Sequence, residues 1–89
     1  MKPILIVKIP QLNDESKNIA TRNLYKIVDN QNMMDDYYIF VLMENKIKTV
    51  KFELVNMEYI KDEKQLKKLK KDIKNSIFTI TKYEPGDET

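Results

Sequence analysis

The stretch ILIVKI, residues 4–9, is an almost continuous apolar run that is rich in β-branched residues and is followed by Pro10. A run of this kind predicts a strand that is buried on both faces and has neighbours on both edges. Proline at its end removes a backbone donor and limits further pairing. We therefore expect residues 4–9 to form the central strand, around which the rest of the fold is arranged.

A polar cluster, residues 13–16 (NDES), follows this strand and predicts the start of a helix. It offers a side-chain oxygen to cap the first turn and two carboxylates to interact with the positive end of the helix. The helical pattern continues from about residue 14 to residue 29. Its predicted apolar face, which is broad enough to lie on a sheet, consists of Ile19, Ala20, Leu24, Ile27 and Val28.

Two more strands are predicted between residues 37 and 54. Residues 37–43 are apolar at every position, and the following Glu44-Asn45-Lys46 has the composition of a tight hairpin turn. Residues 50–54 alternate between apolar and charged side chains, so one face of this strand belongs to the core. We expect a hairpin that joins these two strands directly.

Asp62 and Gln65 predict the start of a second helix, because an acidic N-cap followed three residues later by Gln is similar to a capping box. The helix then has an apolar stripe at helical spacing, which consists of Leu66, Leu69, Ile73 and Ile77.

The end of this second helix can be interpreted in two ways. Ile80 extends the apolar stripe and favours a helix to about residue 81, whereas Thr79, Thr81 and Tyr83 are better suited to a strand. We favour a helix that ends at Asn75 and a fourth strand over residues 77–83.

The resulting element order, βαββαβ, predicts a ferredoxin-like α+β fold with an antiparallel sheet and two helices on one face. The alternative is βαββα with a long C-terminal helix over residues 62–81. We expect residues 1–83 to form a single α+β domain and residues 84–89 to form a flexible acidic tail. The predicted core consists of Leu24, Ile27, Val50, Phe52, Leu54, Leu66, Leu69 and Ile73.

The residue types that the chain lacks argue against catalysis. It contains no His and no Cys, which removes the commonest general base, thiolate chemistry and disulfides. Its single glycine, Gly86, cannot form a glycine-rich phosphate loop. Asp35 and Asp36 could contribute to a magnesium site, but adjacent strand residues point to opposite faces, and a turn is the better interpretation. We expect no enzymatic activity, no cofactor, no metal and no small-molecule substrate.

Lysine is concentrated in the second predicted helix. Residues 61–74 contain seven Lys and three acidic residues. Such a face could bind nucleic-acid phosphates or an acidic protein surface. Because the chain has one Arg and its strands lack the aromatic pattern of RNA-recognition sheets, nucleic-acid binding would be weak and unspecific. The predicted outward face of the helix, our candidate for binding a charged partner, consists of Lys64, Lys67, Lys68, Lys71 and Lys74.

The predicted sheet carries more apolar side chains than one core requires. Strand 37–43 is apolar on both faces, and an apolar edge strand is a liability unless another surface covers it. The first strand adds either Ile4 and Ile6, or Leu5, Val7 and Ile9, to the face that the helices leave open. An exposed apolar face of this kind indicates a protein-binding surface. The candidate residues for it are Tyr38, Phe40, Ile4 and Ile6.

These patterns predict a small, non-enzymatic regulatory module that binds another protein, either as a homodimer or through a foreign target, by its apolar sheet face or edge. The N-terminal apolar run is too short to span a membrane and lacks a cleavage site, which favours a cytoplasmic protein without membrane partners. The abundance of Lys, Asn and Ile is typical of AT-rich coding, so we hypothesise a phage or mobile-element accessory protein that inhibits a host factor. The alternative is a nucleic-acid-associated protein that uses the lysine-rich helix.

Overall fold

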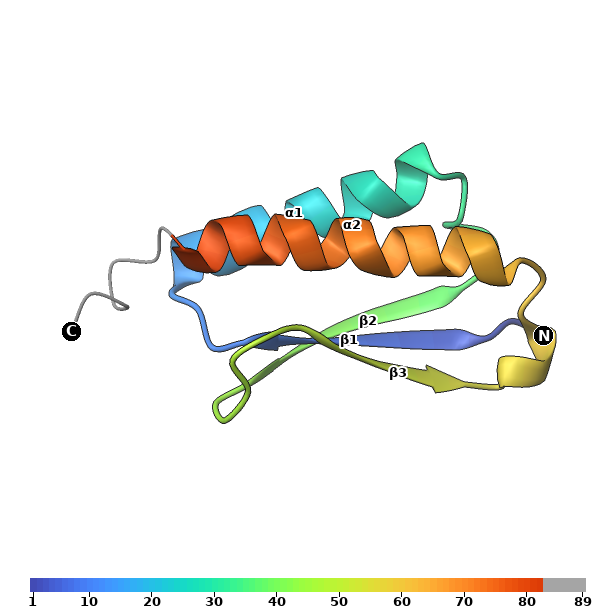
Figure 1. Ribbon diagram of the computed structural model, residues 1–89, viewed down its shortest axis with the longest axis horizontal. Helices are drawn as coiled ribbons and strands as arrows, with labels where there is room; N and C mark the ends of the chain where they lie inside the picture. Colours follow the sequence, from blue (N-terminus) through green and yellow to red (C-terminus); the bar gives the residue numbers. More distant parts are fainter. Residues whose placement is uncertain (83–89) are drawn as a thin grey trace.

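The computed structural model describes residues 1–82 and places two long helices against a three-stranded sheet (Figure 1). The tail predicted for residues 84–89 lies outside the described residues. In chain order the elements are β1 (Ile4–Pro10), α1 (Asp14–Asn30), β2 (Tyr38–Glu44), β3 (Lys51–Val55), a 3-10 turn η1 (Met57–Tyr59) and α2 (Glu63–Lys82).

The sheet is mixed and has the strand order β2-β1-β3. β1 is the central strand, as predicted. It pairs in parallel with β2, with Ile4 opposite Tyr38, and antiparallel with β3, with Ile4 opposite Val55. The prediction of an antiparallel ferredoxin-like sheet is therefore wrong. The helix α1 returns the chain to the start of the sheet, as in the ferredoxin-like arrangement, but β2 then pairs directly with β1 and not with β3.

The hairpin predicted at residues 44–46 is also absent, because β2 and β3 lie on opposite sides of β1. The chain between them must cross the end of β1, a separation of about 10 Å for two strand spacings. Residues 45–50 make this crossing, and Val50 is buried at its end.

The C-terminal segment is a single helix, so the predicted fourth strand at residues 77–83 and the predicted helix end at Asn75 are wrong. α2 continues to Lys82, which matches the alternative βαββα order closely. The apolar stripe explains this outcome, because Ile77 is buried and Ile80 packs against the core. The two threonines that favour a strand are accommodated by hydrogen bonds to the preceding turn, from the Thr79 hydroxyl to the Asn75 carbonyl (2.9 Å) and from the Thr81 hydroxyl to the Phe78 carbonyl (3.0 Å).

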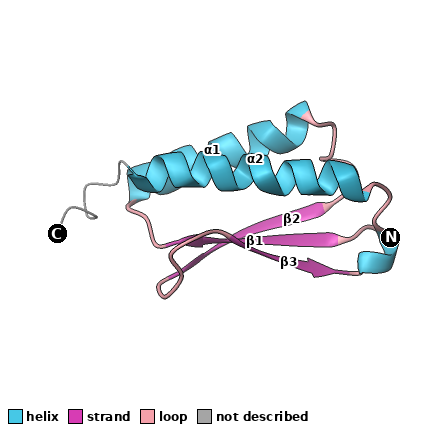
Figure 2. Cartoon of the chain, viewed as in Figure 1, coloured by secondary structure: helices cyan, strands magenta, loops and turns pink. Residues whose placement is uncertain are grey.

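Both helices cover the same face of the sheet, and α1 packs against α2 (Figure 2). The core between the two layers receives Leu5, Val7 and Ile9 from β1. All eight residues of the predicted core belong to it, although Ile27, Phe52 and Leu54 are only partly buried. One prediction for α1 is wrong: Ile19 is 40% exposed, because the sheet and α2 contact a narrower stripe of Ala20, Leu24 and Val28.

The two ends of α1 are fixed by local hydrogen bonds. At its start, Oδ1 of Asn13 accepts from the Ser16 N–H (2.8 Å), as the polar cluster predicts. At its end, Asn32 adopts a left-handed conformation (φ 56°), and Met33 N–H donates to the Val28 carbonyl (3.1 Å). This pattern is a Schellman cap, and it turns the buried Met33 side chain into the core.

Candidate protein-binding surface

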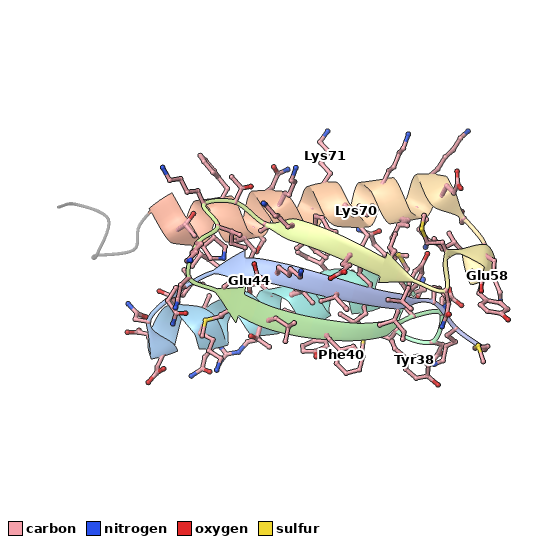
Figure 3. The ribbon with its side chains drawn as sticks, turned by 90° about the horizontal axis from the view of Figure 1, so that it is seen from below. Tyr38, Phe40, Glu44, Glu58, Lys70 and Lys71 are labelled. Atoms are coloured by element: carbon pink, nitrogen blue, oxygen red, sulfur yellow. The ribbon has the colours of Figure 1, made fainter. Side chains whose placement is uncertain are left out.

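The side of the sheet that faces away from the helices forms a continuous surface, which we call the open face. Because strand side chains alternate, burying Leu5, Val7 and Ile9 directs the other residues of β1 outward. No described helix lies over this face, and Figure 3 looks directly onto it, with Tyr38 and Phe40 along its β2 border. The open face consists of Ile4, Ile6, Lys8, Tyr38, Phe40, Leu42, Glu44, Lys51, Glu53 and Val55.

Apolar side chains occupy most of the open face. Tyr38, Phe40 and Leu42 are exposed to 51%, 54% and 50%, and Val55 to 42%. The register places Tyr38 and Val55 on either side of Ile4, and Phe40 beside Ile6. The structure thus brings together the four candidate residues from the sequence, Ile4, Ile6, Tyr38 and Phe40, and adds Leu42 and Val55.

The charged residues of the open face gather around Lys8. Its Nζ lies 3.1 Å from Glu53 Oε2 and 3.5 Å from Glu44 Oε1. The hydrogen bond to Glu53 and the negative charge of Glu44 raise the pKa of Lys8 above its usual value, so the ammonium group stays charged at neutral pH. At the other end of the face, Lys2 Nζ lies 4.6 Å from the centre of the Tyr38 ring, a cation–π contact.

The second candidate surface is the outward side of α2, which we call the lysine face: Lys64, Lys67, Lys68, Lys71 and Lys74. All five side chains are exposed, and within residues 1–82 none of them forms an ion pair. In Figure 3, Lys71 projects away from the sheet. Because α2 does not end at Asn75, the face continues to Phe78, an exposed aromatic residue. Lys70 differs from these lysines, since its Nζ lies 5.8 Å from the Phe52 ring centre.

A polar link between α1 and α2 involves two glutamines. Gln65 N–H donates to Asp62 Oδ1 (3.0 Å), as expected for a helix cap. Its side chain does not return to the N-cap but donates to the Gln31 carbonyl (2.7 Å), while Gln31 Nε2 donates to Asp72 Oδ2 (2.7 Å). The capping box is therefore half formed, because the Gln65 amide instead satisfies a carbonyl at the end of α1.

Asp35 and Asp36, the residues considered for a magnesium site, lie in a turn before β2. Asp36 N–H donates to the Met33 carbonyl (3.1 Å), the bond of a tight turn that leads into β2. Within the described part of the chain, no three acidic residues gather to hold a metal ion. The neighbouring Tyr37 is buried, and this burial, together with the charges of Asp36 and Asp62, raises the pKa of its phenol. None of the helices in residues 1–82 is both long and apolar enough to cross a membrane.

Comparisons of this chain with protein-family models, with curated proteins and with solved structures found no match.

Proposed function

We propose that this chain is a non-enzymatic protein-binding module, and that its open face receives an apolar patch of a foreign protein. The observation that carries the proposal is the row of half-exposed side chains Tyr38, Phe40 and Leu42 beside Ile4 and Ile6. Aromatic residues in an apolar surface are the usual anchors of protein interfaces, because they bury a large area at a low cost in conformational entropy.

The charges of the open face indicate the chemistry of the partner. Lys8 and Lys51 carry two positive charges at this end of the face, and Glu44 and Glu53 carry two negative charges, so an incoming surface does not need to supply a net counter-charge there. A neutral, apolar patch buries the aromatic anchors without bringing a further charge into the interface. Since the sequence has neither His nor Cys, we assign binding rather than catalysis to this face.

Phe40→Lys is expected to weaken binding of the partner by about tenfold or more, since loss of a central aromatic anchor costs about 2 kcal/mol or more of binding free energy. Ile19→Lys is the matched control, because Ile19 is another exposed apolar residue but lies on α1, outside the open face. The partner is first captured on the immobilised chain from a cell lysate and identified by mass spectrometry. The purified pair is then measured by isothermal titration calorimetry with each variant.

The proposal requires that Ile19→Lys binds like the unaltered chain and that Phe40→Lys does not. Equal affinities for the unaltered chain and Phe40→Lys would contradict it, provided that circular dichroism shows both to be folded.

A second candidate function, binding of nucleic acid, is favoured by the five exposed lysines of the lysine face. Helix α2 has no arginine for bidentate base contacts, and Phe78 is its one aromatic residue. Such a surface is suited to weak phosphate binding or to electrostatic steering of an acidic protein.

Changing Lys67, Lys71 and Lys74 together to Glu is expected to slow association with an acidic partner, and to abolish any binding of duplex DNA. For DNA, log affinity should fall with log salt by about 0.9 per neutralised phosphate. Fluorescence anisotropy with a labelled duplex, at several salt concentrations, measures this slope. Submicromolar DNA binding by the unaltered chain at physiological salt would make nucleic acid the better assignment.

A further inference from the structure

The outer edge of β2 has a defined pattern of free backbone groups. Tyr38 N–H donates to the Pro3 carbonyl (3.0 Å), so the backbone groups of Tyr38 point toward β1. Because these groups alternate in direction along a strand, those of Ile39, Val41 and Met43 point the other way, to the free edge. Within residues 1–82, no strand pairs with this edge.

The free edge of β2 is accessible rather than covered by α1. A groove of about 430 Å³ runs between the two elements and is lined by the strand and by Lys17, Thr21 and Tyr25 of α1. Tyr25 is exposed to 40%. β2 also lacks the features that usually prevent edge pairing, since residues 38–43 contain no proline and no charged residue.

We propose that two copies of this chain pair antiparallel along β2, with the two-fold axis at Val41. In this register Val41 faces Val41 of the second copy, and Ile39 faces Met43. Every outward backbone group of the strand then finds a partner, which gives six hydrogen bonds, two for each of the three facing pairs. Main-chain bonds of this kind provide the affinity in strand addition.

Side chains on the open face also match in this register. Phe40 lies opposite Leu42 of the second copy, and Tyr38 lies opposite Glu44. The Lys2 ammonium group lies over the Tyr38 ring, so in this register it comes close to the Glu44 carboxylate of the second copy. This pair of opposite charges occurs at both ends of the paired strands. A register centred on Phe40 would instead place Glu44 opposite Asp36, two like charges, and would pair fewer outward groups.

The paired strands would form a continuous six-stranded sheet with both open faces on one side. This inference does not depend on the proposed function, because the hydrogen bonds that carry it are made by the backbone of the strand edge.

Val41→Pro is the first test. Proline at this position removes only an outward N–H, so the ladder with β1 is kept, as for other edge-strand prolines. Light scattering coupled to size exclusion is expected to give twice the chain mass for the unaltered protein and one chain mass for Val41→Pro. A monomeric unaltered chain overturns the proposal and leaves the edge to an extended segment of a foreign protein. A dimer lost in Phe40→Lys but retained in Val41→Pro also overturns it, because the contact would then lie on the open face.

Cysteine variants test the register and do not depend on the stability of Val41→Pro. Phe40 and Leu42 of the second copy form a non-hydrogen-bonded pair, whose Cα atoms lie about 4.5 Å apart, within the range for a disulfide. The natural chain has no Cys. Intact mass spectrometry after mild oxidation should show a disulfide dimer when Phe40→Cys and Leu42→Cys are mixed, and little with either variant alone. Efficient cross-linking of Phe40→Cys with itself, or none in the mixture, overturns the register.

Discussion

Leu69→Ala is expected to lower the free energy of unfolding by about 2–5 kcal/mol, the range for truncating a buried leucine that leaves a cavity. Leu69 is fully buried where α2 packs on the core. Since a small domain has only about 5–15 kcal/mol of stability in total, this loss should leave a large fraction of the chain unfolded at moderate temperature. Urea unfolding followed by circular dichroism measures the shift in midpoint.

Lys68→Ala is the matched control, because Lys68 is the adjacent, exposed residue of the same helix. Its effect should stay within about 0.5 kcal/mol. Equal midpoints for the two variants would show that α2 does not pack as described. Phe52, which the alternating pattern of residues 50–54 ranks as a core residue, is only partly buried on the edge strand β3, so its truncation should cost less than that of Leu69.

The sequence predicted a helix or strand correctly where residues within that one segment determine its structure. The continuous apolar run of β1 required two neighbours, and the structure provides them. The cap at Asn13 and the apolar stripe of α2 likewise depend on residues close in sequence. Such signals can be read from one chain because their physical cause lies within one or two helical turns or strand repeats.

The pairing of the strands could not be read from the sequence, because it is decided by contacts far apart in the chain. Residues 38–43 are apolar on both faces of the strand. Nothing in them shows whether this strand pairs antiparallel with β3, which follows it in the chain, or in parallel with β1, which precedes it. Asn45 and Lys46 suit a tight turn, yet they lie at the start of a crossing over the end of β1. The apolar pattern fixed the existence of β2 but not its partner.

The candidate surface was predicted in part for a related reason. Whether Ile4 and Ile6 or Leu5, Val7 and Ile9 face outward depends on which side of β1 the helices cover, and the sequence of β1 is apolar on both sides. Val55 was missed because the third strand was expected to end at Leu54. Lys51, Glu53 and Val55 are two residues apart, so extending the strand by one residue would have placed Val55 on the same outward face as Lys51 and Glu53.

In residues 77–82, packing against the core outweighs the preference of the individual residues for a strand. Phe78, Thr79 and Thr81 favour a strand by residue type, but Ile73, Ile77 and Ile80 repeat at intervals of three and four residues. Only a helix directs these three isoleucines to the core together, and their burial outweighs a propensity difference of a few tenths of a kcal/mol per residue.

Ser76→Pro provides the decisive test of this continuous helix. Ser76 lies inside α2, where proline would remove the hydrogen bond to the Asp72 carbonyl and clash with the preceding turn. We expect a loss of about 3 kcal/mol or more in the free energy of unfolding. If the helix instead ended at Asn75, residue 76 would lie in a connecting turn, where proline is well tolerated.

Ser76→Ala is the control for this test, because it removes the same hydroxyl and keeps the backbone N–H. It should unfold at the same urea concentration as the unaltered chain, or slightly above it, since alanine is the better helix former. Far-UV circular dichroism of Ser76→Pro should also show a loss of helical signal. Because Ile77 and Ile80 lie beyond the break, their detachment from the core would add to the cost of the proline itself. Midpoints that coincide for the proline and alanine variants would contradict a helix that extends to Lys82 and would restore the fourth strand.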